Sequence, residues 1–113
     1  MKRRIIFVIF VFISAAVLSF AQNNILVLNS THKGNTFTDR ITSGIEGPTK
    51  RNRPNVNIYN EYLDLLRAPL SDNQLQAFSE FLAKKYEKIR IDVIVTTDDE
   101  GLFFAVKLRD KFK

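Results

Sequence analysis

The sequence predicts an α/β domain with a three-layer parallel sheet, in which a strand and a helix alternate three times. Two apolar runs, at 25–28 and 91–97, are typical of buried parallel strands. Breaker and cap residues separate these runs from segments with helical spacing of apolar residues. Helices between successive strands require parallel pairing with right-handed crossovers. A chain of 113 residues has room for one such small domain.

The first strand is expected at Ile25–Leu28, followed by a polar loop at 31–35. A helix is expected to begin near Thr36. Its helical spacing is carried by apolar residues four apart: Phe37, Ile41 and Ile45. The breaker pair Gly47–Pro48 predicts the end of this helix, and residues 50–55 are expected to form a solvated connection.

Two further strand–helix units follow. Residues 56–62 alternate between apolar and polar, which predicts a half-covered strand. Ser71 and Gln74 have the spacing of a capping box, which predicts the start of the second helix. An apolar stripe follows: Leu75, Phe78, Leu82, Tyr86 and Ile89. The third strand is expected at 91–97, and Asp98 can cap the last helix because its carboxylate accepts from free helical amides.

Residues 1–21 have the layout of a secretory signal peptide. Three basic residues precede an apolar run from Ile5 to Leu18, and the small-residue ending predicts cleavage after Ala21. The run is shorter than the roughly 20 residues of a membrane span, and an uncleaved anchor is the alternative. Either reading predicts that residues 22–113 are exported, with a bacterial periplasm as the expected compartment.

Composition narrows the expected function. The leader carries three of the charges behind the formal net charge of +5, so charge alone gives little support for nucleic-acid binding. One histidine and no cysteine leave no metal cluster and no disulfide. Ser30 and His32 lack a third group to orient the imidazole, so no catalytic set is visible. We therefore expect a binding protein rather than an enzyme, with no metal and no cofactor.

The loop after the first strand leaves one alternative open. Thr31, Gly34, Asn35 and Thr36 are similar to the phosphate loop of flavodoxins, which bind FMN there. Lys33 stands where flavodoxins usually have a small hydroxyl residue. This short resemblance implies a flavodoxin-like electron carrier with FMN.

Three ordered blocks carry a longer resemblance, at 25–39, at 61–67, and at 85–86 together with 91–99. They resemble the periplasmic substrate-binding-like proteins of ABC transport type, a family also used as extracytoplasmic sensor domains of bacterial histidine kinases and diguanylate cyclases. The family patterns are Asn/His-Ser-Tyr-His with a later Trp-Thr-Asp, then E-Y-L-D-x-x-R, then D-x-I-x-x-x-D-D. This chain departs from them at three positions: Thr31 for Tyr, Phe37 for Trp and Gly101 for Ala.

The resemblance implies the first lobe of a type I periplasmic binding protein-like fold. Family members continue with a fourth strand and a second lobe, and the last helix is apolar over more than one face. We therefore expect residues 22–113 to be a partial N-terminal lobe, a fragment of a longer protein. The implied partners are a small-molecule ligand, the missing second lobe or downstream domains, and an inner-membrane permease or a kinase module.

The resemblance also implies a set of ligand-binding residues: Ser30, Thr31, His32, Phe37, Thr38 and Asp98. For Asp98 a helix cap is the competing interpretation. Asp64 and Arg67 are expected to form a structural ion pair.

Overall fold

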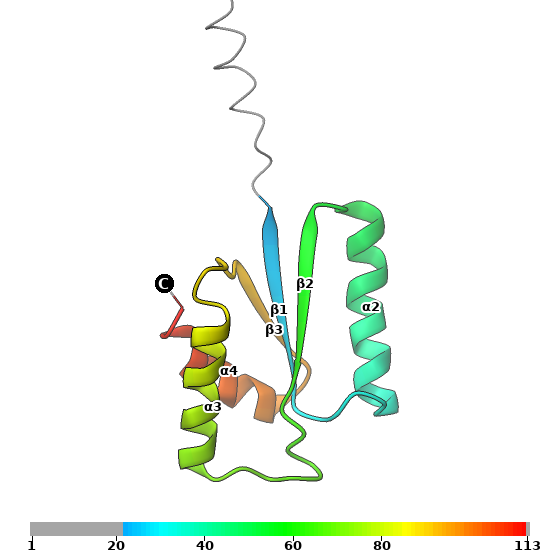
Figure 1. Cartoon of the computed structure of the whole chain (residues 1–113). Helices are drawn as coiled ribbons and strands as arrows, with labels where there is room; N and C mark the ends of the chain where they lie inside the picture. The colour runs from blue at the N-terminus through cyan, green and yellow to red at the C-terminus, as the bar shows by residue number, and fades with distance from the viewer. Residues whose placement is uncertain (1–21, 113) are drawn as a thin grey trace, which may run out of the picture.

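The computed structural model describes residues 22–112, so the predicted signal peptide at 1–21 lies outside the described residues. The described chain is a small α/β domain (Figure 1), and its elements follow the predicted strand–helix order. They are β1 (Asn23–Asn29), α2 (Thr36–Asn52), β2 (Val56–Tyr62), α3 (Asp72–Lys85), β3 (Val93–Thr96) and α4 (Asp99–Arg109). None of the helices within residues 22–112 combines the length and hydropathy that a membrane crossing requires.

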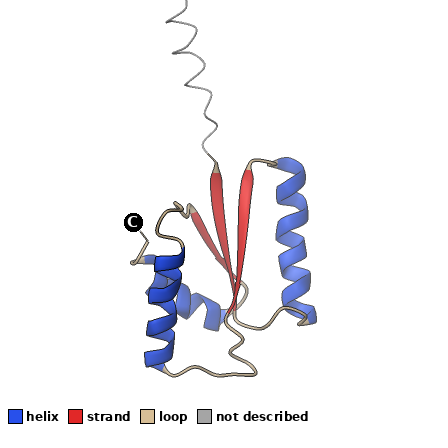
Figure 2. Ribbon diagram, in the orientation of Figure 1, coloured by secondary structure: helices blue, strands red, loops and turns tan. Residues whose placement is uncertain are grey.

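The three strands form a parallel sheet in the order β2-β1-β3. In the register, Leu28 of β1 lies opposite Glu61 of β2 and Thr96 of β3. Because β1 is central, its residues Leu26, Val27 and Leu28 are fully buried. Figure 2 places α2 on one side of the sheet and α3 and α4 on the other. The parallel pairing and the predicted layering are confirmed to this extent.

The apolar core lies between the sheet and the helices α3 and α4. Its buried members are Leu26, Leu28, Leu63, Leu82, Tyr86, Phe104, Ala105 and Leu108. Two aromatic contacts connect its elements. The rings of Tyr59 and Tyr86 meet edge to face with centroids 5.4 Å apart, and those of Phe78 and Phe104 lie 5.8 Å apart. These contacts join β2 to the end of α3, and α3 to α4.

The helix α2 faces the sheet through hydroxyl groups rather than through its apolar spacing. Thr38 and Thr42 are its buried residues, whereas Phe37 is 59% exposed. Thr42 donates to the side-chain oxygen of buried Asn29 at 3.4 Å. This contact supplies a partner for a polar group that burial would otherwise leave without water.

The predicted end of α2 at Gly47–Pro48 is wrong. The helix continues through this pair to Asn52, and so takes in the first part of the predicted connection at 50–55. Proline removes one backbone N–H and leaves the carbonyl of Gly44 without its helical donor. Both Gly44 and Pro48 are exposed, so water can hydrogen-bond to this carbonyl and the penalty is reduced.

The second helix starts where the sequence predicts. The capping box between Ser71 and Gln74 is closed in both directions and satisfies two amides of the first turn. The helix ends at Lys85, with Tyr86 as its C-cap. The predicted stripe residue Ile89 therefore lies beyond the helix, although it still packs against the core.

The strand β3 is shorter than the predicted 91–97 and begins at Val93. Directly before that residue, the amide of Asp92 donates to the carbonyl of Asn24 at 2.9 Å, and side-chain hydrogen bonds add to this contact. The Asp92 carboxylate accepts from the amide of Asn24 at 2.9 Å, and the Asn24 side chain donates to the carbonyl of Arg90 at 2.8 Å.

Candidate functional site

The carboxyl ends of the three strands meet at one edge of the sheet, the lower edge in Figure 1. Ligands of open α/β sheets bind outside such an edge, where the winding of the chain reverses. Backbone hydrogen bonds hold the loops together there. The amide of Leu63 donates to the carbonyl of Asn29 at 2.8 Å, and that of Leu65 donates to Ser30 at 2.7 Å. The loops after β1 and β2 therefore leave the sheet side by side.

A side-chain hydrogen bond joins the loops after β1 and β3. The buried hydroxyl of Ser30 donates to one oxygen of the Asp98 carboxylate. The other oxygen accepts from the amide of Gly101 at 2.9 Å, so Asp98 is the N-cap of α4. Both oxygens are engaged within the protein. The cap interpretation of Asp98 is confirmed, and its contact with a ligand stays a prediction.

The loop after β1 is tied to the first turn of α2. The hydroxyls of Thr31 and buried Thr38 share a hydrogen bond. The side chain of Asn35 accepts from the amides of Phe37 at 3.1 Å and of Thr38 at 3.3 Å. Phe37 itself is exposed beside these anchored residues, so its ring is accessible at the rim of the site.

The loop after β2 contributes a charged pair. Arg67 donates two hydrogen bonds to Asp64 Oδ2, at 2.7 and 3.1 Å, and one to Oδ1 at 2.9 Å, which forms the predicted ion pair. These bonds hold the pKa of Asp64 below its usual range, because they outweigh the opposing effect of desolvation, which raises it. The backbone of Asp64 has φ +53°, a left-handed conformation that is uncommon outside glycine and often marks functional segments.

His32 lies against this pair. Its Nδ1 is 3.4 Å from Asp64 Oδ1, which is close enough for electrostatic attraction. No hydrogen bond forms at this nitrogen, although the atom is buried. A buried ring nitrogen without a hydrogen-bond partner is the type of group that a bound molecule or water satisfies. We name Ser30, Thr31, His32, Asp64, Arg67 and Asp98 together the carboxyl-edge site.

The backbone geometry gives little support to a phosphate cradle in the loop after β1. The amides of Phe37 and Thr38 both donate to the side-chain oxygen of Asn35. The amide of Gly34 donates to Asp39 at 3.1 Å. An anion at a helix N-terminus is held by free amides, and here three of them already have a partner within the chain. This weighs against the flavodoxin-like interpretation.

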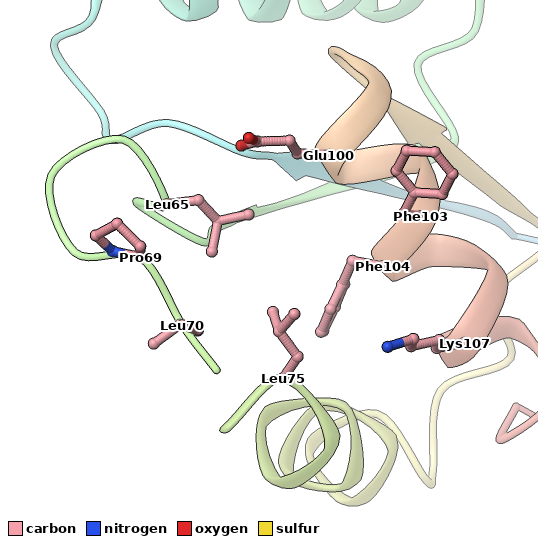
Figure 3. A pocket seen from close by; sticks show the side chains of 8 residues that line it. All are labelled: Leu65, Pro69, Leu70, Leu75, Glu100, Phe103, Phe104 and Lys107. Carbon is pink, nitrogen blue, oxygen red and sulfur yellow. The ribbon is translucent and has the colours of Figure 1, made fainter. Parts of the chain in front are cut away.

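Sequence reasoning missed an apolar groove beside this edge. Its volume is about 320 Å³, and Figure 3 shows the loop after β2 on one side and α4 on the other. Its lining is Leu65, Pro69, Leu70, Leu75, Phe103 and Phe104, with Glu100 and Lys107 as the charged members. Three separate segments contribute to it. The only signal in the sequence is the second apolar face of the last helix.

A polar hollow of about 500 Å³ lies between α2 and β2. Within it Asn60 donates to Glu46 at 2.7 Å, while the side-chain oxygen of Asn60 is buried without a partner. Burial, followed by the charges of Asp39 and Glu46, raises the pKa of Tyr62 above its usual value. This hollow also escaped sequence reasoning, because it depends on how α2 is placed over β2.

No family model, no curated protein and no solved structure matches this chain. Among residues 22–112, no group of three or more histidine, aspartate or glutamate side chains is placed to hold a metal ion. The functional argument therefore depends on the geometry of the site and on the sequence blocks that meet there.

Proposed function

We propose that this chain is an extracytoplasmic small-molecule-binding module, part of the first lobe of a type I periplasmic binding protein-like domain. One observation carries the proposal: residues of the three separate sequence blocks lie side by side at one sheet edge. Ser30 and Asp98 are hydrogen-bonded although 68 positions separate them. His32 and Asp64, from the first and second blocks, are 3.4 Å apart.

The site offers the elements from which small-molecule sites are built. The imidazole of His32 and the partly exposed hydroxyl of Thr31, which buried Thr38 holds in place, supply directional hydrogen bonding, and Phe37 supplies an exposed aromatic wall. A drug-sized ligand is normally buried over most of its surface. One lobe covers one side of it, so a second lobe or a partner supplies the other, and closure between the two gives the signal.

The same module serves two systems in the family that the blocks resemble. In an ABC transport system the closed form delivers its ligand to an inner-membrane permease. In a sensor it acts on a downstream kinase or cyclase domain. Both roles need export, which the signal peptide-like segment at 1–21 supports; an uncleaved segment would instead anchor the module in the membrane.

The test is an NMR titration of the full chain, purified after export, with amino acids, sugars and small organic acids as separate probes. We expect millimolar or weaker binding by one probe class, with shifts confined to residues 30–38 and 64–67. His32→Ala and Phe37→Ala should abolish the shifts. Phe81→Ala is the matched control, since Phe81 is 57% exposed on α3 and lies outside the site.

Three outcomes would contradict the proposal or parts of it. Micromolar binding by the isolated chain would contradict the need for a second lobe. Shifts that map to the apolar groove, and that persist in His32→Ala, would place the ligand elsewhere. Flavin absorbance in the purified protein would favour the electron-carrier alternative over a binding module.

A further inference from the structure

The three strands begin at the edge of the sheet opposite the carboxyl-edge site, the upper edge in Figure 1, which we call the amino edge. The last turn of α2 with its connection to β2, and the connection from α3 to β3, both reach this edge. They carry five exposed basic residues, which we call the amino-edge patch: Lys50, Arg51, Arg53, Lys88 and Arg90. The dipole of a helix favours basic residues in its last turn, which accounts for Lys50 and Arg51 but not for the three residues outside helices.

Three members of the patch carry charges without an internal partner. Among residues 22–112, Arg51, Arg53 and Lys88 form no ion pair. The other two members, Lys50 and Arg90, are each paired with a neighbouring carboxylate, at 3.4 and 2.5 Å. An exposed charge without a partner in the protein is available to an anion outside it.

The side chain of Asn24 fixes the shape of the amino edge. It accepts from the Asn57 side chain of β2 at 2.9 Å and donates to the carbonyl of Arg90 at 2.8 Å. On the other connection, the amide of Val56 donates to the carbonyl of Arg53 at 3.1 Å, which closes the turn before β2. Neighbouring strands lie about 4.8 Å apart, so the two connections meet the sheet about 10 Å apart, on either side of β1. The patch is therefore held on an ordered edge.

The opposite edge of the sheet is acidic. Its loops, at 29–39, 63–72 and 97–100, carry six acidic residues: Asp39, Asp64, Asp72, Asp98, Asp99 and Glu100. The same loops carry two basic residues, Lys33 and Arg67. The described domain therefore has a basic end and an acidic end along the strand direction. At an anionic surface, such a charge asymmetry turns the basic end inward and the acidic end outward.

The sequence before β1 indicates which anionic surface the patch meets. The apolar run from Ile5 to Leu18 is separated from Asn23 by residues 19–22 alone. If this segment is kept as an anchor, the amino edge lies within roughly 18 Å of the bilayer, and a basic patch is the second signal that stable anchoring commonly needs. If the segment is cleaved, the patch alone makes the contact and the binding is weaker. In both cases an exported chain meets lipid headgroups before it meets a nucleic acid.

We propose that the amino edge docks on a bilayer that contains anionic phospholipid, with Arg51, Arg53 and Lys88 against the headgroup phosphates. The docked domain presents its acidic edge, and the candidate ligand site there, away from the membrane. A later strand beside β3 would extend the sheet sideways and leave both connections at the amino edge, and a second lobe would lie at the carboxyl edge. The proposal therefore goes beyond ligand binding, agrees with it and does not rest on it.

Co-sedimentation of the full chain, purified after export, with lipid vesicles tests this proposal. The probes are vesicles of phosphatidylcholine alone and vesicles of phosphatidylcholine with phosphatidylglycerol. We expect the partition coefficient to be about a hundredfold higher on the anionic vesicles, and to fall as salt is added. A retained apolar anchor would bind both kinds of vesicle alike, so the ratio of the two coefficients isolates the electrostatic contribution.

Charge-removing variants locate the contact. Arg53→Gln should lower this ratio about fivefold, and the triple variant Arg51→Gln, Arg53→Gln, Lys88→Gln should bring it close to one. Arg40→Gln is the matched control, because Arg40 is exposed near the start of α2, about 18 Å along the helix from Asn52, and should leave the ratio unchanged. The substituted side chains are all exposed, so we expect each variant to fold like the wild type.

Three outcomes overturn the proposal. One is equal partition of the wild type onto the two kinds of vesicle. Another is an Arg40→Gln variant that loses as much binding as Arg53→Gln, since net charge rather than the patch would then cause the attraction. The third is binding to double-stranded DNA at a lower phosphate concentration than to the anionic vesicles, which would indicate a nucleic-acid partner. A failed ligand titration, in contrast, leaves this proposal standing.

Discussion

The hydroxyl of Ser30 is bonded to the carboxylate of Asp98, across the point where the winding of the sheet reverses between β1 and β3. The same carboxylate caps α4 through the amide of Gly101. A single side chain therefore fixes the start of one helix and the position of the loop after β1. This connects the stability of α4 to the geometry of the candidate site.

The first prediction concerns this connection. Asp98→Ala should lower the free energy of unfolding by about 1–2 kcal/mol, because the helix loses its cap. Ser30→Ala should cost about 1 kcal/mol. The double variant should cost less than the sum by about 0.5 kcal/mol or more, as expected for partners in contact. Urea denaturation measures all three; Ser71→Ala, which removes the cap of α3, should be additive with Ser30→Ala.

The second prediction compares two helical glycines. Gly44→Ala on exposed α2 meets open space and should stabilise the chain by about 0.5–1 kcal/mol. At buried Gly101 an added methyl group would meet the Leu28 carbonyl and the Asp98 carboxylate, both at 3.3 Å. We expect this crowding to cancel the helical gain, so that Gly101→Ala is the less stable variant. If both variants raise the melting temperature equally, the Asp98 side chain can move to make room for the added methyl group, and this expectation is wrong.

Local signals account for what the sequence predicted well. The capping box at Ser71 and the apolar run of β1 depend on neighbouring residues alone, and both are present. The prediction that α2 ends at Gly47–Pro48 was wrong. It considered only the local penalty of Pro48, whereas contacts elsewhere along α2 hold the helix to the sheet. Thr42 bonds Asn29 and Glu46 bonds Asn60, and no periodicity in the sequence encodes either pair.

The sequence could predict which loops form the candidate site, but not the hydrogen bonds that connect their side chains. Parallel topology alone brings His32 and Asp64 to the same edge, because both follow adjacent strands. The Thr31–Thr38 hydrogen bond and the left-handed turn at Asp64 depend on backbone conformations within the loops. The apolar groove requires the placement of α4 against the loop after β2, which no single segment specifies.

The third prediction is a loss of stability in acid. The Asn24 amide bonded to Asp92, and the Arg67 guanidinium bonded to Asp64, hold the pKa of each carboxyl below its usual value. A carboxyl with a lowered pKa stabilises the fold while ionised, and this contribution is lost as the pH falls through its folded pKa. We therefore expect the free energy of unfolding to decline between about pH 4 and pH 2.

Asp92→Asn tests the source of that decline. The amide oxygen can still accept from Asn24, but the group no longer titrates, so the acid limb should be shallower than in the wild type. Asp110→Asn is the control, because Asp110 accepts no hydrogen bond from a backbone amide and pairs only with its neighbour Arg109. A pH profile unchanged by Asp92→Asn would assign the acid sensitivity to other groups.

The fourth prediction concerns Pro48 inside α2. Pro48→Ala restores the amide that donates to the carbonyl of Gly44, and removes a residue that costs about 3 kcal/mol in a helix interior. Solvation of that exposed carbonyl already offsets part of this cost, so we expect a gain of about 1 kcal/mol in the free energy of unfolding. Pro54→Ala, in the exposed turn after the helix, should give no gain. A loss of stability in urea denaturation would contradict this expectation. Pro48 would then be compatible with the helix and would stabilise the fold by restricting the unfolded chain.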